Sequence, residues 1–140
     1  MKLDLASSGI AARLSAALIV LALPAAAQFT FDDPKLYPAG SDPHDVAVGD
    51  FDGDGDLDLV TSLHNPPRIS VLRNNGDGTF ARPEITDLPI AVSLQGVVAP
   101  DFDVDGLADI AVNSEETGML IILHNLGNAN FSLIAQLQVG

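Results

Sequence analysis

The sequence contains no cysteine and no tryptophan, and basic residues are scarce. The absence of cysteine excludes a disulfide framework and a cysteine nucleophile. Only 6 Lys and Arg residues stand against 19 Asp and Glu, which gives a net charge of −13 at pH 7. A chain with this balance repels phosphate backbones and anionic lipid headgroups. We therefore expect no nucleic acid and no anionic membrane surface among its partners.

Helical periodicity is also missing after Gln28. No stretch of twelve or more residues spaces its apolar side chains three and four apart, whereas short apolar runs bounded by Gly, Pro, Asn and Asp recur throughout. The pattern predicts an all-β body without significant helix, in which residues 82–95 form a connection with two prolines. The expected strands are 29–31, 45–48, 57–62, 69–73, 79–81, 96–99, 109–113 and 119–124.

Residues 1–27 have the pattern of a secretory signal peptide. Lys2 and Arg13 supply positive charge, residues 14–23 form an apolar run, and three alanines precede Gln28. An uncleaved membrane anchor is the weaker alternative, because a bilayer core needs roughly 20 apolar residues. We expect a secreted protein, whether extracellular, at the cell surface or periplasmic. After cleavage, a repeat region at 28–140 remains, without a stable membrane span.

The stretch 50–58, Asp-Phe-Asp-Gly-Asp-Gly-Asp-Leu-Asp, holds five carboxylates that would repel one another unless a cation lies among them. Alternate hard oxygen ligands, a glycine at the sharp turn and a closing carboxylate suit Ca²⁺. Gly55 would make the turn. The predicted ligands are the carboxylates of Asp50, Asp52, Asp54 and Asp58 and the backbone carbonyl of Asp56.

The same pattern returns 51 residues later, at 101–109. Its predicted ligands are the carboxylates of Asp101, Asp103, Asp105 and Asp109 and the backbone carbonyl of Leu107. The alternative, two solvated acidic turns, does not explain why carboxylates occupy the same places in both copies. An EF-hand needs a carboxylate at its twelfth place and flanking helices. Thr61 and Val112 stand there instead, between β-rich flanks. Two Ca²⁺ sites are therefore predicted.

The repeat extends beyond the acidic loops. The turn sequence at 74–80, Asn-Asn-Gly-Asp-Gly-Thr-Phe, predicts a hairpin because Asn-Gly and Asp-Gly accept positive φ. Residues 125–131 occupy the equivalent place, so Phe80 and Phe131 are also 51 residues apart. The body holds about two and a third copies of a unit of about 50 residues, and such a period indicates an array of supersecondary units.

Residues 46–60 and 74–80 together resemble the FG-GAP / VCBS repeat of bacterial secreted proteins and integrin α-subunit propellers, and the resemblance covers nearly all of 29–140. It implies four-stranded β-propeller blades, each with a Ca²⁺ loop between its first two strands. The second copy departs from the pattern at Val104, where a glycine is common, and at 128–130.

Two blades cannot close a ring of roughly four to eight. We expect part of a larger propeller, as a truncated piece of a longer protein or, as the second interpretation, in an assembly of copies. The further blades would lie in cis or come by oligomerisation.

No catalytic motif is present among these residues, since the Gly-x-Ser-x-Gly and His-Glu-x-x-His patterns are both missing. We therefore expect no enzyme activity, but a secreted calcium-binding module for an unknown protein or carbohydrate ligand. The alternatives are the propeller portion of a polysaccharide-acting enzyme whose catalytic part is absent here, and a structural spacer. His44, His64 and His124 do not recur at equivalent places, which favours solvated surface histidines over a transition-metal site.

Overall fold

The computed structural model describes residues 33–139. The chain divides into two units, Met1–Pro34 and Lys35–Gly140, and the second unit contains all the strands described below. The predicted signal peptide at 1–27 and the strand predicted at 29–31 lie outside the described residues.

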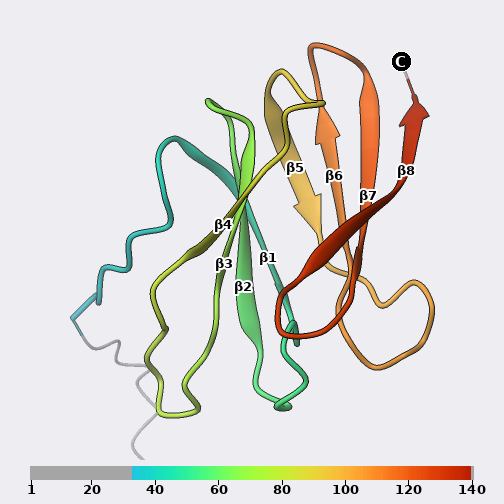
Figure 1. The fold of residues 1–140 in the computed structure, drawn as a ribbon. Coiled ribbons are helices and arrows are strands. Elements are labelled where there is room, and N and C mark those ends of the chain that lie inside the picture. The colour runs from blue at the N-terminus through green and yellow to red at the C-terminus, as the bar shows by residue number, and fades with distance from the viewer. Residues whose placement is uncertain (1–32, 140) are drawn as a thin grey trace, which may run out of the picture. The chain divides into compact units, whose positions relative to one another are not determined.

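Two four-stranded antiparallel sheets make up the second unit (Figure 1). Each sheet is a meander, so strands that follow one another in sequence pair side by side. No helix occurs in residues 33–139, which confirms the all-β prediction, and accordingly none there is long and apolar enough to cross a bilayer. The first sheet holds β1 (Pro43–Gly49), β2 (Asp58–Leu63), β3 (Arg68–Leu72) and β4 (Glu84–Asp87), and the second holds β5 (Leu94–Val98), β6 (Ile110–Ser114), β7 (Met119–Asn125) and β8 (Phe131–Gln138).

Two of these strands were not predicted from the sequence: β8 has no counterpart among the expected strands, and β4 falls where none was expected. Strand β4 lies within 82–95, which was predicted as a connection, while the strand predicted at 79–81 is only an isolated bridge between Asn74 and Phe80. The hairpin turn itself is as predicted, because the Asn75 backbone N–H donates to the carbonyl of Thr79 at 2.9 Å. The prolines at 83 and 89 flank β4 without entering it, and as an edge strand β4 tolerates them there.

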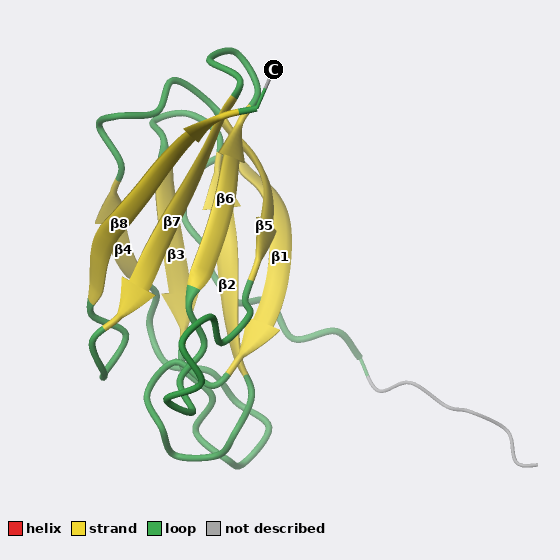
Figure 2. Ribbon diagram, turned by 90° about the vertical axis from the view of Figure 1, so that its right-hand side faces the viewer, coloured by secondary structure: helices red, strands yellow, loops and turns green. Residues whose placement is uncertain are grey.

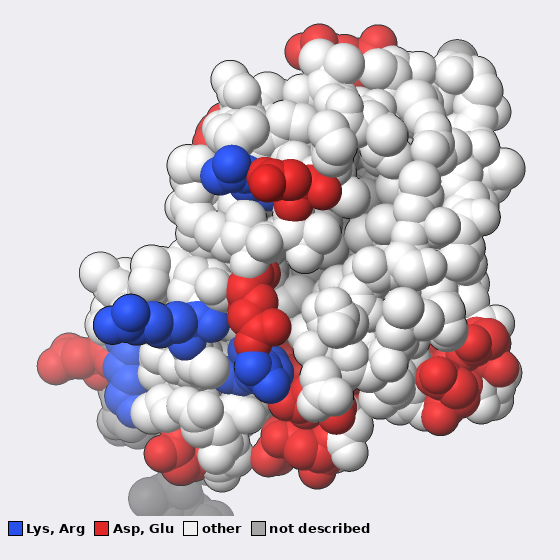
Figure 3. All heavy atoms as spheres, viewed as in Figure 1, with Lys and Arg blue, Asp and Glu red and all other residues white. Residues whose placement is uncertain are grey.

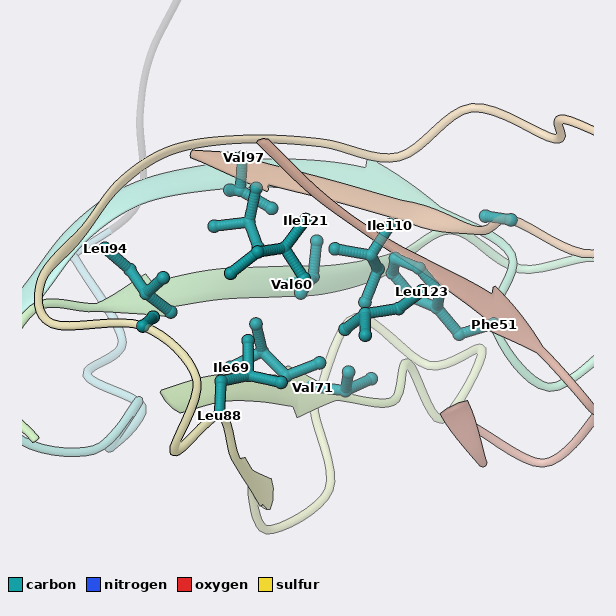
Figure 4. Close-up of a cluster of buried hydrophobic side chains, with 13 residues drawn as sticks. Phe51, Val60, Ile69, Val71, Leu88, Leu94, Val97, Ile110, Ile121 and Leu123 are labelled. Carbon is teal, nitrogen blue, oxygen red and sulfur yellow. The ribbon is translucent and has the colours of Figure 1, made fainter. Parts of the chain in front are cut away.

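The hydrophobic core lies between the two sheets, which pack face to face (Figure 2). Side chains alternate across a strand, so only every second residue of β2 and β3 faces the second sheet. Burial stabilises each such aliphatic side chain by about 1.5–3 kcal/mol. The first sheet contributes Val60, Ile69 and Val71, and the second contributes Val97, Ile110, Val112, Ile121 and Leu123 (Figure 4).

Phe51 enters this core from the loop between β1 and β2, and its side chain is fully buried (Figure 4). Its ring meets that of Phe131 edge to face, with 5.9 Å between centroids. The Phe51 carbonyl accepts hydrogen bonds from the Ala129 backbone N–H and the Asn125 side-chain Nδ2, both at 2.9 Å. The first acidic loop is therefore fixed to the second sheet as well as to its own.

Candidate metal centre

The two acidic loops occupy equivalent places, one between β1 and β2 and the other between β5 and β6. Acidic side chains gather at the lower end of the view in Figure 3, where these two loops lie in Figure 1. Both loops follow the first strand of a sheet and lead into the second, so the repeat places them at the same end of the two sheets.

In the first loop the chain wraps around the carboxylate of Asp50. Its Oδ1 accepts a hydrogen bond from the Gly53 N–H at 2.7 Å, and its Oδ2 accepts one from the Gly55 N–H at 3.0 Å. Gly55 has a φ of 90°, which makes the sharp reversal expected of it. Asp54 lies further along, where its Oδ1 accepts from the Asp56 N–H at 2.9 Å. These bonds fold the loop back around the Asp50 carboxylate.

Carboxylate oxygens of Asp50, Asp52 and Asp58 lie within 4.8 Å of one another. Asp54 is not part of this group. The carboxylate of Asp56 lies against Gly76 in the neighbouring hairpin turn, as suits a residue that was predicted to offer only its backbone oxygen. The first loop thus assembles three of its four predicted carboxylates.

The second loop repeats the wrap around Asp101. Its Oδ1 accepts from the Val104 N–H at 2.7 Å and its Oδ2 from the Gly106 N–H at 3.0 Å, while the Leu107 N–H donates to Asp105 at 2.8 Å. This loop assembles all four predicted carboxylates in two overlapping groups, because Asp103 belongs to both. One group is Asp101, Asp103 and Asp105, and the other is Asp103, Asp109 and His124.

Asp58 and Asp109, the closing carboxylates, also have a structural role that the sequence did not reveal. Both are buried, and each uses its two oxygens to accept two backbone hydrogen bonds. Asp58 binds the N–H groups of Phe51 and Asn74 at 3.0 and 2.7 Å. Asp109 likewise binds those of Phe102 and Asn125 at 2.9 and 2.8 Å. Each carboxylate therefore joins the start of its loop to the end of the third strand of its sheet.

The pKa values of these two carboxyls move in opposite directions. Burial raises the pKa of Asp58 above its ordinary value, and the negative charges of Asp52 and Asp54 add to the rise, against the two backbone donors. Burial also acts to raise the pKa of Asp109, but the N–H groups of Asn125 and Phe102 and the His124 ring outweigh it, so this pKa is lowered. The buried carboxylate of the second loop thus has a side-chain partner, His124, that the buried carboxylate of the first loop lacks.

His124 is not the solvated surface residue that was predicted. Its Nδ1 lies 3.1 Å from Asp109 Oδ1 and 3.5 Å from Asp103 Oδ2. The residue 51 positions earlier is Arg73, whose Nη1 lies 3.8 Å from Asp52 Oδ2 and which also pairs with Glu84. Each loop therefore has one basic side chain beside it. A search for basic character at equivalent places, instead of identical residues, would have found this pair.

His44 and His64, by contrast, come together away from the loops. Their rings stack with 5.2 Å between centroids, and His64 Nδ1 lies 3.4 Å from the Asp42 carboxylate. Within residues 33–139 they belong to no group of three possible metal ligands.

Val104 has a φ of 64°, in the left-handed region that a β-branched residue rarely adopts. Its equivalent, Gly53, has a φ of 83°. Val104→Gly should therefore raise the free energy of unfolding by about 1 kcal/mol, because the side chain is exposed and contributes little packing. The matched change Gly53→Val should lower it by at least as much. Urea denaturation at fixed CaCl₂ measures both, and a Val104→Gly variant no more stable than the wild type would contradict the strain.

The FG-GAP-like repeat family matches the chain twice, at residues 2–61 and 62–112. Each match ends three residues after an acidic loop, and the two ends are 51 residues apart. The first match also runs through the segment predicted as a signal peptide. Neither the curated proteins nor the solved structures contain a match to this chain. With both repeats matched over most of the chain, and with two four-stranded sheets that resemble propeller blades, the chain belongs to the FG-GAP-like repeat family.

Proposed function

We propose that each acidic loop binds one Ca²⁺ and that the chain is a secreted, calcium-stabilised binding module for a protein or carbohydrate ligand. One observation carries the proposal: the same wrapped loop, with carboxylate oxygens within 4.8 Å of one another, is built twice at an offset of 51 residues.

The electrostatic balance supports a cation in both loops. Two like charges 4 Å apart cost about 1 kcal/mol in water and about 4 kcal/mol at a protein surface. The first loop contains five carboxylates. The guanidinium of Arg73 lies beside one of them, that of Asp52, and also pairs with Glu84. A divalent cation with oxygen ligands would replace this repulsion by attraction. Mg²⁺ fits poorly, because it demands a tighter octahedron and gives up its water reluctantly.

Secretion is part of the same proposal, since a weak Ca²⁺ site stays filled where the ion is near millimolar. FG-GAP-like repeats are a non-catalytic module. Ligand binding is therefore proposed for the surface of the module and not for the loop carboxylates, which the cations would occupy.

Calorimetry on the exported protein tests this proposal. The secreted chain should begin at Gln28, as N-terminal sequencing would establish, and should bind two Ca²⁺. Asp52→Asn and Asp103→Asn should each leave one site, because these carboxylates belong to the grouped ligands. Asp56→Asn is the matched control and should leave two sites, since the side chain lies outside the group. Two sites in both loop variants, or none in the wild type, would refute the assignment.

A further inference from the structure

Each sheet has two faces, and the contact between the sheets uses one face of each. We call the face that the first sheet turns toward the second its trailing face, and the face that the second sheet turns toward the first its leading face; equivalent faces take the same names in both sheets. The trailing face of the first sheet carries Val60, Ile69 and Val71, together with Phe51 from the loop. It packs on the leading face of the second sheet, which carries Val97 of β5 and the inward side chains of β6 and β7. Because the repeat length is 51 residues, every position in this contact has an equivalent on a face that neither of the two sheets in residues 33–139 covers.

The trailing face of the second sheet is open. Phe102 is 49% exposed, whereas its equivalent Phe51 is fully buried. Val98 on the same face is 57% exposed. Leu120 and Ile122 are half-buried, although their equivalents Ile69 and Val71 are buried in the core. None of these residues is charged, although the chain as a whole carries −13. An uncharged apolar patch on a strongly acidic protein is typical of an interface.

The leading face of the first sheet is open along β1. Val46 is 57% exposed, whereas its equivalent Val97 is 4% exposed against the first sheet. Val48 is 55% exposed, and its equivalent Ala99 packs against the core. At the end of β2 the same face is covered by the segment that precedes β1, because the backbone at Gly40 lies against the buried Leu63. The uncovered part is therefore the strip along β1.

We propose that copies of this chain associate head to tail, with the trailing face of the second sheet of one copy on the β1 strip of the next. Both halves of the contact that already exists inside the chain recur, uncovered, on its two outer faces. A second copy supplies the matching half for each. Such a contact is heterologous, so it closes into a ring or continues as a filament.

Two single substitutions of equally exposed valines test the contact. Val98→Asp places a charge on the trailing face of the second sheet, and Val46→Asp places one on the β1 strip. Both side chains are 57% exposed, so both variants should fold, as circular dichroism and melting in millimolar CaCl₂ would verify. In sedimentation velocity the wild type should form species larger than a monomer, and each variant alone should be monomeric.

Mixing the two monomeric variants gives the decisive result. Each keeps one intact half of the contact, so a 1:1 mixture should form a dimer and nothing larger. Leu126→Ser is the control and should associate like the wild type, because Leu126 is exposed at a hairpin tip equivalent to the exposed Asn75. A wild type that stays monomeric with Ca²⁺ bound would overturn this proposal and leave the calcium assignment standing. Monomeric variants that do not dimerise on mixing would overturn it, and a single variant that still associates like the wild type would overturn it in favour of a two-fold contact between identical faces.

Discussion

Removal of Ca²⁺ with EGTA is expected to lower the melting temperature of the mature protein by roughly 10–20 °C, and millimolar CaCl₂ is expected to restore it. An ion that binds only the folded state at about 100 times its Kd adds about 2.7 kcal/mol per site. Two sites would then supply a large share of the 5–15 kcal/mol that is usual for a domain.

The structure explains why the effect should reach the whole sheet pair. Asp58 holds the backbone of Phe51 as well as that of Asn74, and the Phe51 ring fills the core between the sheets. Repulsion that opens the first loop therefore removes a buried aromatic from the core. Thermal melting followed by circular dichroism measures the shift. MgCl₂ at the same concentration is the control and should restore little of it, and a melting temperature indifferent to Ca²⁺ would show that the loops are solvated turns.

Phe51→Ala should lower the free energy of unfolding by about 3–5 kcal/mol, because it removes a fully buried ring and leaves a cavity against Phe131. The chain provides its own control. Phe102→Ala changes the same residue type in the same Asp-Phe-Asp setting, but its ring is 49% exposed, so the loss in dilute solution should stay within about 1 kcal/mol. Urea denaturation with CaCl₂ held constant measures both variants, and equal losses would mean that the Phe51 ring does not hold the two sheets together.

The sequence predicted the features that depend on local chemistry. Short apolar runs between turn residues identified most strands, because period-two alternation and Gly, Asn and Asp turns act over a few residues. The acidic loops were located because their carboxylates and glycines recur at fixed places. Strand β4 was missed for the same reason, since its four residues lie between prolines and only pairing with β3 makes them a strand.

Features that depend on distant parts of the chain could not be predicted. Phe51 and Phe102 have the same neighbours in sequence, yet one is buried and the other half exposed, because only the first has a sheet beside it. The hydrogen bonds of Asp58 and Asp109 to the third strand, and the place of His124 beside the second loop, likewise require a partner 15 or 16 positions away. A pattern confined to nine residues contains no information on these contacts.

The bonds that hold Phe51 also affect the order in which the molecule can fold. Asn125 Nδ2, 74 positions later, donates to the Phe51 carbonyl, and Phe131 completes the packing of its ring. During synthesis the first acidic loop emerges long before these residues do, and contacts of such separation form slowly. The first loop to be synthesised therefore reaches its final geometry only after β7 and the turn that follows it are in place.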